Sequence, residues 1–137
     1  MLSRRADVFF YGLFMDQDLL RAKGILPEAA ELAWLDGFAL RIGQRAALVP
    51  SAPGRVYGLV MSLTLAELKR LYSEPGLEAY KPQAVLAHVA GGSVIAALCY
   101  NLPEPPSPGE HNSEYAGKLR AVGQKVGLPA DYMAALQ

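Results

Sequence analysis

The segment from Ala6 to Tyr11, ADVFFY, is the feature that most constrains the fold. It is apolar and aromatic, is too short for a helix and has no polar alternation, which predicts a strand buried on both faces. Such a strand should be central in its sheet. Gly12 follows at once, and Asp16 or Asp18 can cap a short helix in DQDLLRAKG that ends at Gly24. The opening is therefore predicted as strand, tight turn and helix.

The middle of the chain is predicted to be mostly β-structure. Residues 32–42 are strand-like on both sides of Asp36-Gly37, a dipeptide that favours a turn or a bulge. The runs AALVP and GRVYGLVMSL continue the pattern, and PSAPG is expected to form a loop between them. Thr64 with Glu67 three residues later forms a capping box, which predicts a helix through LAELKRLY that Pro75-Gly76 ends.

The second half carries the clearest hairpin. Residues 84–89 and 93–101 are strand-like on either side of Gly91-Gly92. The proline-rich stretch LPEPPSPGEH then predicts an extended surface loop. In the tail, one apolar helix face ends at Gly127, and Pro129 is suited to open a last short helix. The residues of that apolar face are Tyr115, Leu119, Val122 and Val126.

Length and composition bound the architecture. At 137 residues, 52% hydrophobic and 19% charged, the chain is predicted to be one globular domain over residues 1–137 without an internal repeat. Because strands come first and helices are inserted and appended, the fold class is predicted as α+β.

Several partner classes are disfavoured. Thirteen basic and thirteen acidic residues cancel, so we expect no nucleic-acid partner. No apolar run approaches the roughly 20 residues of a membrane helix, and Asp7 interrupts the stretch that superficially resembles a signal peptide. Cys99, in VIAALCY, is interpreted as a buried apolar residue, which fits a cytoplasmic location.

Few residues offer chemistry. His88, in a predicted strand, and His111, in the proline-rich loop, have no second ligand at metal spacing, and Cys99 has no neighbouring base. Glu74 follows the end of a helix where the chain turns back to the sheet, so it is either a partly desolvated proton carrier or a solvated loop acid. At Gly12, the backbone can approach a ligand, or the glycine only turns the chain.

Four stretches together resemble the γ-glutamylcyclotransferase-like superfamily across nearly the whole chain. They are YGLFM after the first strand, RVYGLVMSLTLAELKRLYSEPGLEAY, the hairpin ending in ALCYNL, and SEYAGKLRAVGQKVGLPADYMAAL. The resemblance implies a small mixed β-barrel or sheet with inserted and C-terminal helices. The V-x-G strand and the Gly-Leu-Pro element of the tail match the family pattern best.

Carried over residue by residue, the resemblance implies a site. Its ligand-holding turn falls on Tyr11, Gly12, Leu13 and Phe14, and its acid/base glutamate falls on Glu74. Its cavity-lining tyrosines fall on Tyr80, Tyr100 and Tyr115.

In such enzymes the α-amine of a γ-glutamyl compound attacks its own γ-carbonyl, which forms 5-oxoproline and expels an amine. One glutamate can carry the proton while backbone amides hold the substrate. The resemblance implies a small-molecule γ-glutamyl substrate and neither a cofactor nor a metal. The oligomeric state is left open, with a homodimer as one expectation.

The sequence departs from the family pattern at two places, which leaves both the acid and the activity open. Leu13 stands where the family has Ser or Thr, and Glu74 is one residue nearer the preceding leucine than usual, with Tyr72 at an aspartate position. Glu78 is therefore a second candidate for the acid. The alternatives to an enzyme are a binding protein that keeps the cavity without the reaction, and an interaction protein that docks Pro103–Pro108 into a partner groove.

Overall fold

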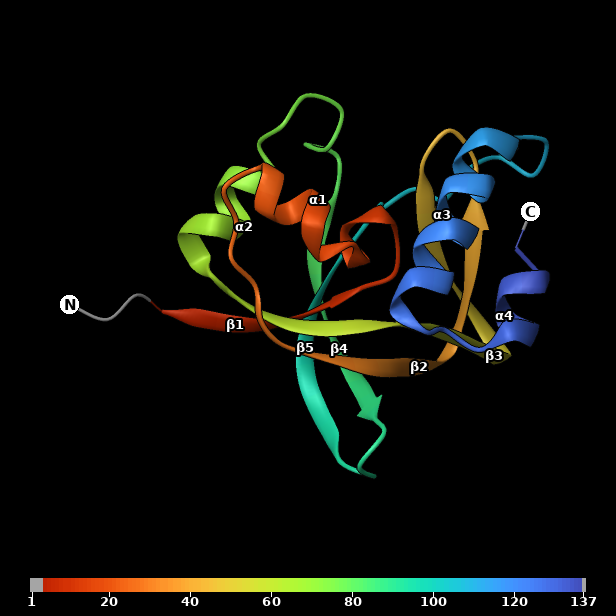
Figure 1. Ribbon diagram of the computed structural model, residues 1–137. Helices are drawn as coiled ribbons and strands as arrows, with labels where there is room; N and C mark the ends of the chain where they lie inside the picture. Colours follow the sequence, from red (N-terminus) through yellow and green to blue (C-terminus); the bar gives the residue numbers. More distant parts are fainter. Residues whose placement is uncertain (1–3, 137) are drawn as a thin grey trace.

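The structure is a computed structural model that describes residues 4–136, and these fold into a closed five-stranded barrel with helices packed outside it (Figure 1). The elements are β1 (Arg5–Phe10), the 3₁₀ helix η1 (Leu13–Met15), α1 (Gln17–Ala22), β2 (Glu28–Ile42), β3 (Ala46–Thr64), α2 (Leu65–Leu71), β4 (Lys81–Val89), β5 (Val94–Asn101), α3 (Ser113–Val126) and α4 (Ala130–Ala134). The predicted α+β class is confirmed.

The barrel closes in the order β1-β3-β2-β4-β5. Strand β1 pairs antiparallel with β3 and parallel with β5, where Val8 lies opposite Leu98. It therefore has a neighbour on each side, as expected for a central strand. Strands β2 and β4 meet only around Trp34 and His88, and β4 and β5 form the predicted hairpin across Gly91-Gly92.

Alternation along the strands divides the apolar side chains between two cores. Phe9 and Tyr11 belong to one buried cluster with Cys99 and with Ala, Val and Leu residues of the other strands, which fills the barrel. Val8 and Phe10 point the other way, into a cluster shared with Met15 and the helices. Residues 8–10 are buried on both faces because this half of the strand separates the two cores, whereas Arg5 and Asp7 in the first half are exposed.

One predicted loop is instead part of a long strand. Strand β3 runs continuously from Ala46 to Thr64, through the segment PSAPG. Asp36 of β2 pairs with Arg55, and Phe38 pairs with Pro50, so residues 51–54 bulge out opposite Gly37. Gly37 adopts φ +87°, a conformation that favours glycine. The turn signals in the sequence thus mark a bulge in one long ribbon rather than the end of a strand.

The helix caps follow local sequence. Thr64 and Glu67 form the predicted capping box, with hydrogen bonds of 3.1 and 2.8 Å. Helix α1 is capped by the Asp16 side chain, and α3 ends at Gly127 with φ +87°. A further cap, from Asn112 to the backbone of α3, was not predicted.

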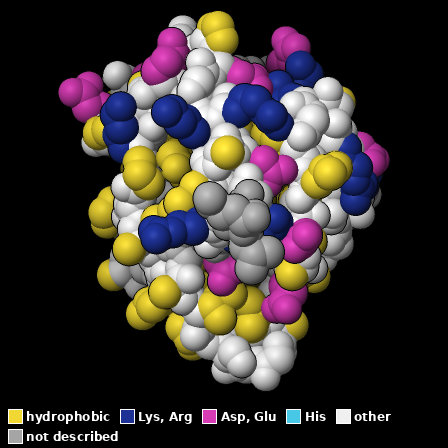
Figure 2. Space-filling view, turned by 90° about the vertical axis from the view of Figure 1, so that its left-hand side faces the viewer, with side chains coloured by type: hydrophobic (Ala, Val, Ile, Leu, Met, Phe, Trp, Pro, Cys, Tyr) yellow, Lys and Arg dark blue, Asp and Glu magenta, His cyan; other side chains and the backbone are white. Residues whose placement is uncertain are grey.

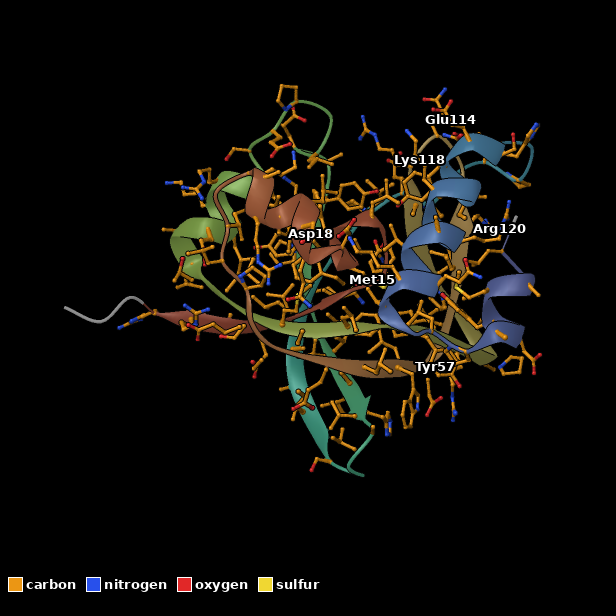
Figure 3. The ribbon with its side chains drawn as sticks, in the orientation of Figure 1. Met15, Asp18, Tyr57, Glu114, Lys118 and Arg120 are labelled. Atoms are coloured by element: carbon orange, nitrogen blue, oxygen red, sulfur yellow. The ribbon has the colours of Figure 1, made fainter. Side chains whose placement is uncertain are left out.

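Helix α3 is tied to its neighbours by charged side chains, several of which Figure 3 labels. The Lys125 ammonium lies 2.8 Å from a carboxylate oxygen of Asp16 and 2.7 Å from one of Asp18. Arg120 donates a 2.8 Å hydrogen bond to the carbonyl of Leu136, beside α4. The ion pair of Lys125 with Asp18 is exposed, so we expect it to add little to stability.

The face in Figure 2 carries Lys, Arg, Asp and Glu side chains intermixed, without an area of one sign. Among the described residues, no helix has the length and apolar character needed to span a membrane.

Candidate functional site

A cavity of about 190 Å³ lies where β1 ends and the chain turns into η1. Its volume corresponds to about six water molecules at about 30 Å³ each, which suits a ligand of amino-acid size rather than a large cofactor. The lining residues are Phe9, Phe10, Tyr11, Gly12, Leu13, Phe14, Gln44, Arg45, Ala46, Tyr72, Leu77, Tyr80, Tyr100 and Tyr115. None of these lining residues, all from the part of the chain that the structure describes, is Asp or Glu.

Two of the tyrosines are fixed by hydrogen bonds to the barrel backbone. The Tyr11 hydroxyl donates to the carbonyl of Tyr100 at 3.0 Å, and the Tyr80 hydroxyl donates to the carbonyl of Ala46 at 2.6 Å. Burial raises the pKa of both phenols, so both stay protonated at neutral pH. These two side chains therefore hold the cavity open as rigid wall elements.

The buried side-chain amide of Asn101 lies behind this wall of the cavity. Asn101 accepts a 2.9 Å hydrogen bond from the Leu48 N–H and donates one of 2.9 Å to the Leu48 carbonyl, which links β5 to β3. Its side-chain oxygen also lies 3.4 Å from the Tyr11 hydroxyl. One side chain thus satisfies both backbone groups of Leu48 on β3 and lies against the Tyr11 hydroxyl.

The opposite wall is an aromatic stack. The rings of Tyr72 and Tyr100 lie parallel with centroids 3.9 Å apart, and Phe14 packs edge-on against Tyr72 at 6.1 Å. Burial holds the pKa of Tyr72 well above its usual range and also raises that of Tyr100. Within residues 4–136 neither hydroxyl donates to a protein acceptor. Both are therefore hydrogen-bond donors available to a ligand.

The turn after β1 supplies backbone donors. The first internal hydrogen bond of η1 runs from the Met15 N–H to the Gly12 carbonyl at 3.1 Å, so the N–H groups of Leu13 and Phe14 precede it. The Tyr115 hydroxyl lies beside this turn, since a Cβ on Gly12 would approach it to 2.7 Å. Burial raises the pKa of Tyr115, and a hydrogen bond from the Leu13 backbone partly opposes that rise.

A second, more polar hollow adjoins the first. This groove has a volume of about 520 Å³ and lies between the turn after β2 and the proline-rich loop. Gln44 and Arg45 line both spaces, so they form a shared rim.

The structure brings together every residue predicted to hold a ligand, but not the predicted acids. Tyr11, Gly12, Leu13, Phe14, Tyr80, Tyr100 and Tyr115 all line the cavity.

Glu74, expected to face the same space, instead points to α1. Its carboxylate lies 2.8 Å from the Lys23 ammonium, and it is not among the lining residues. Glu78 is exposed and also outside the lining, and hydrogen bonds from its own loop backbone lower the pKa of its carboxyl. The physical reason is the ammonium of Lys23, just after α1, which pairs with Glu74 on the side of the loop away from the cavity.

Seven other lining residues were not predicted as site residues: Phe9, Phe10, Gln44, Arg45, Ala46, Tyr72 and Leu77. Tyr72 was noted only as a departure from the family pattern, and Leu77 lies in the same loop. Gln44 and Arg45 occupy the turn between β2 and β3, where no motif marks them. Their place at the cavity arises only from barrel closure.

A family model and several solved structures show which known proteins this chain resembles. The family model described as gamma-glutamyl cyclotransferase, AIG2-like, matches residues 8–119. Among curated proteins, none matches the chain significantly.

Solved structures show the same fold. One titled gamma-glutamyl cyclotransferase superposes with a TM-score of 0.77 at 20% identity, covering 98% of this chain and 89% of its own. An uncharacterized protein from Homo sapiens superposes with a TM-score of 0.75 at 22% sequence identity, and the match covers 97% of this chain and 88% of that protein. An AIG2-like protein from Mus musculus superposes with a TM-score of 0.60 at 17% sequence identity, and the match covers 81% of this chain and 90% of that protein. At these identities the similarity establishes the fold alone.

Proposed function

Because this chain belongs to the AIG2-like gamma-glutamyl cyclotransferase family, we propose that its cavity binds a small γ-glutamyl-type compound. The observation that carries this proposal is a cavity of amino-acid size with aromatic walls, hydroxyl donors and backbone donors. In this proposal the Phe14 N–H holds the ligand carboxylate, and the Leu13 N–H joins it when the ligand takes the place of the Tyr115 hydroxyl. Tyr72, Tyr100 and Tyr115 donate to its remaining polar atoms, and the ring faces exclude water.

Binding without turnover is the function that this geometry supports best. Cyclisation needs a group that takes a proton from the attacking ammonium and gives one to the leaving amine. Protonated tyrosines with raised pKa values are poor bases. Glu74, the candidate acid, is engaged with Lys23 outside the cavity.

The cyclotransferase reaction is the second candidate, and one observation favours it beyond the family. Glu74 lies in the loop that also supplies Tyr72 and Leu77 to the cavity wall, so a local change of that loop would bring its carboxylate to the ligand. The ligand α-nitrogen would then bond to the carbon of the γ-carbonyl group, and the bond from that carbon to the amide nitrogen would break. Glu74 would carry the proton to the departing amine.

The test is a panel of γ-glutamyl amines and dipeptides with two measurements, thermal stabilisation and release of 5-oxoproline. Stabilisation without release supports the binding protein. Release that is lost in Glu74→Gln, but kept in the matched Glu31→Gln on exposed β2, supports the enzyme. In that case Lys23→Met should raise the rate, because it frees the carboxylate. A panel that neither stabilises the protein nor reacts would overturn both candidates.

A further inference from the structure

This inference rests on the proposed function and concerns which γ-glutamyl-type ligand the site prefers. The cavity and the adjoining groove meet at one rim, formed by Gln44 and Arg45. The cavity has a volume of about 190 Å³ and a largely aromatic lining, whereas the groove has a volume of about 520 Å³ and a lining of mixed polar and apolar residues. A ligand whose inner half fills the cavity therefore projects its outer half past Arg45.

Arg45 is the only cationic side chain that lines either space in the described part of the chain. No carboxylate of the described residues lies within 4 Å of its guanidinium. The positive charge of Arg45 nevertheless acts on groups on both sides of the rim. It partly opposes the rise that burial causes in the pKa of Tyr80, and it helps to lower the pKa of Glu78. A guanidinium without a protein partner at such a junction is suited to an anionic ligand group.

The backbone that carries Arg45 is held on both sides. On the groove side, the Glu110 carboxylate accepts hydrogen bonds from the N–H groups of Ser107 at 2.6 Å and Gln44 at 3.4 Å. On the cavity side, the next carbonyl, that of Ala46, accepts the Tyr80 hydroxyl. Within the turn, the Gly43 N–H donates to the Arg45 carbonyl at 3.0 Å. This scaffold fixes the origin of the side chain, which lowers the entropic cost of binding.

The acidic residues of the groove leave the guanidinium available. Glu110 is occupied by backbone N–H groups, and these lower the pKa of its carboxyl. Glu104 is the other acid in the lining and is exposed on the proline-rich loop. It forms no ion pair with Arg45.

We propose that Arg45 is a specificity-determining residue, which selects ligands whose outer half carries a carboxylate in the groove over ligands with a neutral outer half.

The experiment compares two ligands that share the inner half. γ-Glutamylglycine ends in a carboxylate, and γ-glutamyl methylamide ends in a methyl group. Calorimetry on the whole chain should give about tenfold tighter binding of the dipeptide. Arg45→Gln should weaken dipeptide binding by about tenfold and methylamide binding by much less, so that most of the preference disappears. The matched control, Arg4→Gln, makes the same charge change at an exposed position before β1 and should keep the preference.

Salt provides an independent readout. Because Arg45 is exposed, raising the salt concentration should weaken dipeptide binding to wild type but not methylamide binding. Equal affinity of the two ligands would overturn the inference while leaving the proposed function intact. Equal weakening of both ligands in Arg45→Gln would also overturn it, because the residue would then only support the cavity. Absence of binding by either ligand would instead overturn the proposed function, and the inference with it.

Discussion

The ammonium of Lys23, just after α1, and the carboxylate of Glu74, beyond α2, form an ion pair at 2.8 Å. Both side chains are about one-third exposed, at 30% and 35%. We predict a coupling free energy of about 0.5 kcal/mol in a double-mutant cycle of Lys23→Met and Glu74→Gln, measured by urea unfolding. A coupling near zero would indicate that Glu74 is free to point elsewhere in solution, which would favour the enzyme.

Substitution of Gly12 should disturb the cavity through Tyr115. An alanine Cβ would lie 2.7 Å from the Tyr115 hydroxyl, so that ring has to move. Gly12→Ala is expected to lower the free energy of unfolding by about 1–2 kcal/mol and to weaken ligand binding. Tyr115→Phe removes the clashing oxygen, so the double variant should recover stability relative to Gly12→Ala. Additive effects of the two changes would contradict this contact.

Asn101→Leu should cost about 3 kcal/mol of unfolding free energy, because it leaves the buried N–H and carbonyl of Leu48 without partners. Gln83→Leu is the matched control. Gln83 is exposed and only accepts a 3.3 Å hydrogen bond from Asn101, so its loss should cost about 0.5 kcal/mol. Similar losses in denaturant unfolding of both variants would show that the Leu48 pairing contributes little.

Gly58 marks a close approach between strands. A Cβ there would overlap the backbone carbonyl of Phe10, which cannot move without breaking the β1–β3 ladder. Gly58→Ala is therefore expected to destabilise the fold by about 3 kcal/mol. Gly91→Ala, where a Cβ meets nothing within 4 Å, should change stability by less than about 1 kcal/mol. The melting temperatures of the two variants provide the measurement.

Burial raises the pKa of the Cys99 thiol from 9.0 to about 12. The folded state therefore holds this proton more tightly than the unfolded state, and the resulting stability is complete below about pH 9 and is lost as the pH rises towards 12. Unfolding free energies of wild type should fall over this window by up to about 1.4 kcal/mol per pH unit for this group.

Cys99→Ala should show a shallower decline, with the remaining slope due to the buried tyrosines. A thiol reagent at pH 8 should modify native Cys99 only as fast as the protein opens. Rapid labelling of the folded chain would contradict its burial.

Features set by neighbouring residues could be predicted from sequence. The Thr64 cap, the Gly91-Gly92 hairpin and the Gly127 helix end each depend on a few adjacent positions, and the structure has all three. The backbone turn at Gly12 was likewise identified, because a strand that ends on glycine before a helix is a local pattern.

The rest depends on contacts between distant parts of the chain. Arg45 reaches the cavity because the barrel closes, and nothing in its own turn indicates that position. The direction of Glu74 is set by Lys23, 51 residues earlier in the chain. Side-chain direction after a helix end follows the nearest suitable partner, which sequence spacing does not identify.

The walls of the cavity come from β1, η1, the turn after β2, the start of β3, the loop after α2, β5 and α3. No fragment of the polypeptide contains enough of them to form the hollow, so occupancy by a small molecule is a property of the fully assembled barrel. Binding of a compound in the cavity therefore reports that the whole barrel is folded. Release of that compound on heating or in urea should coincide with global unfolding.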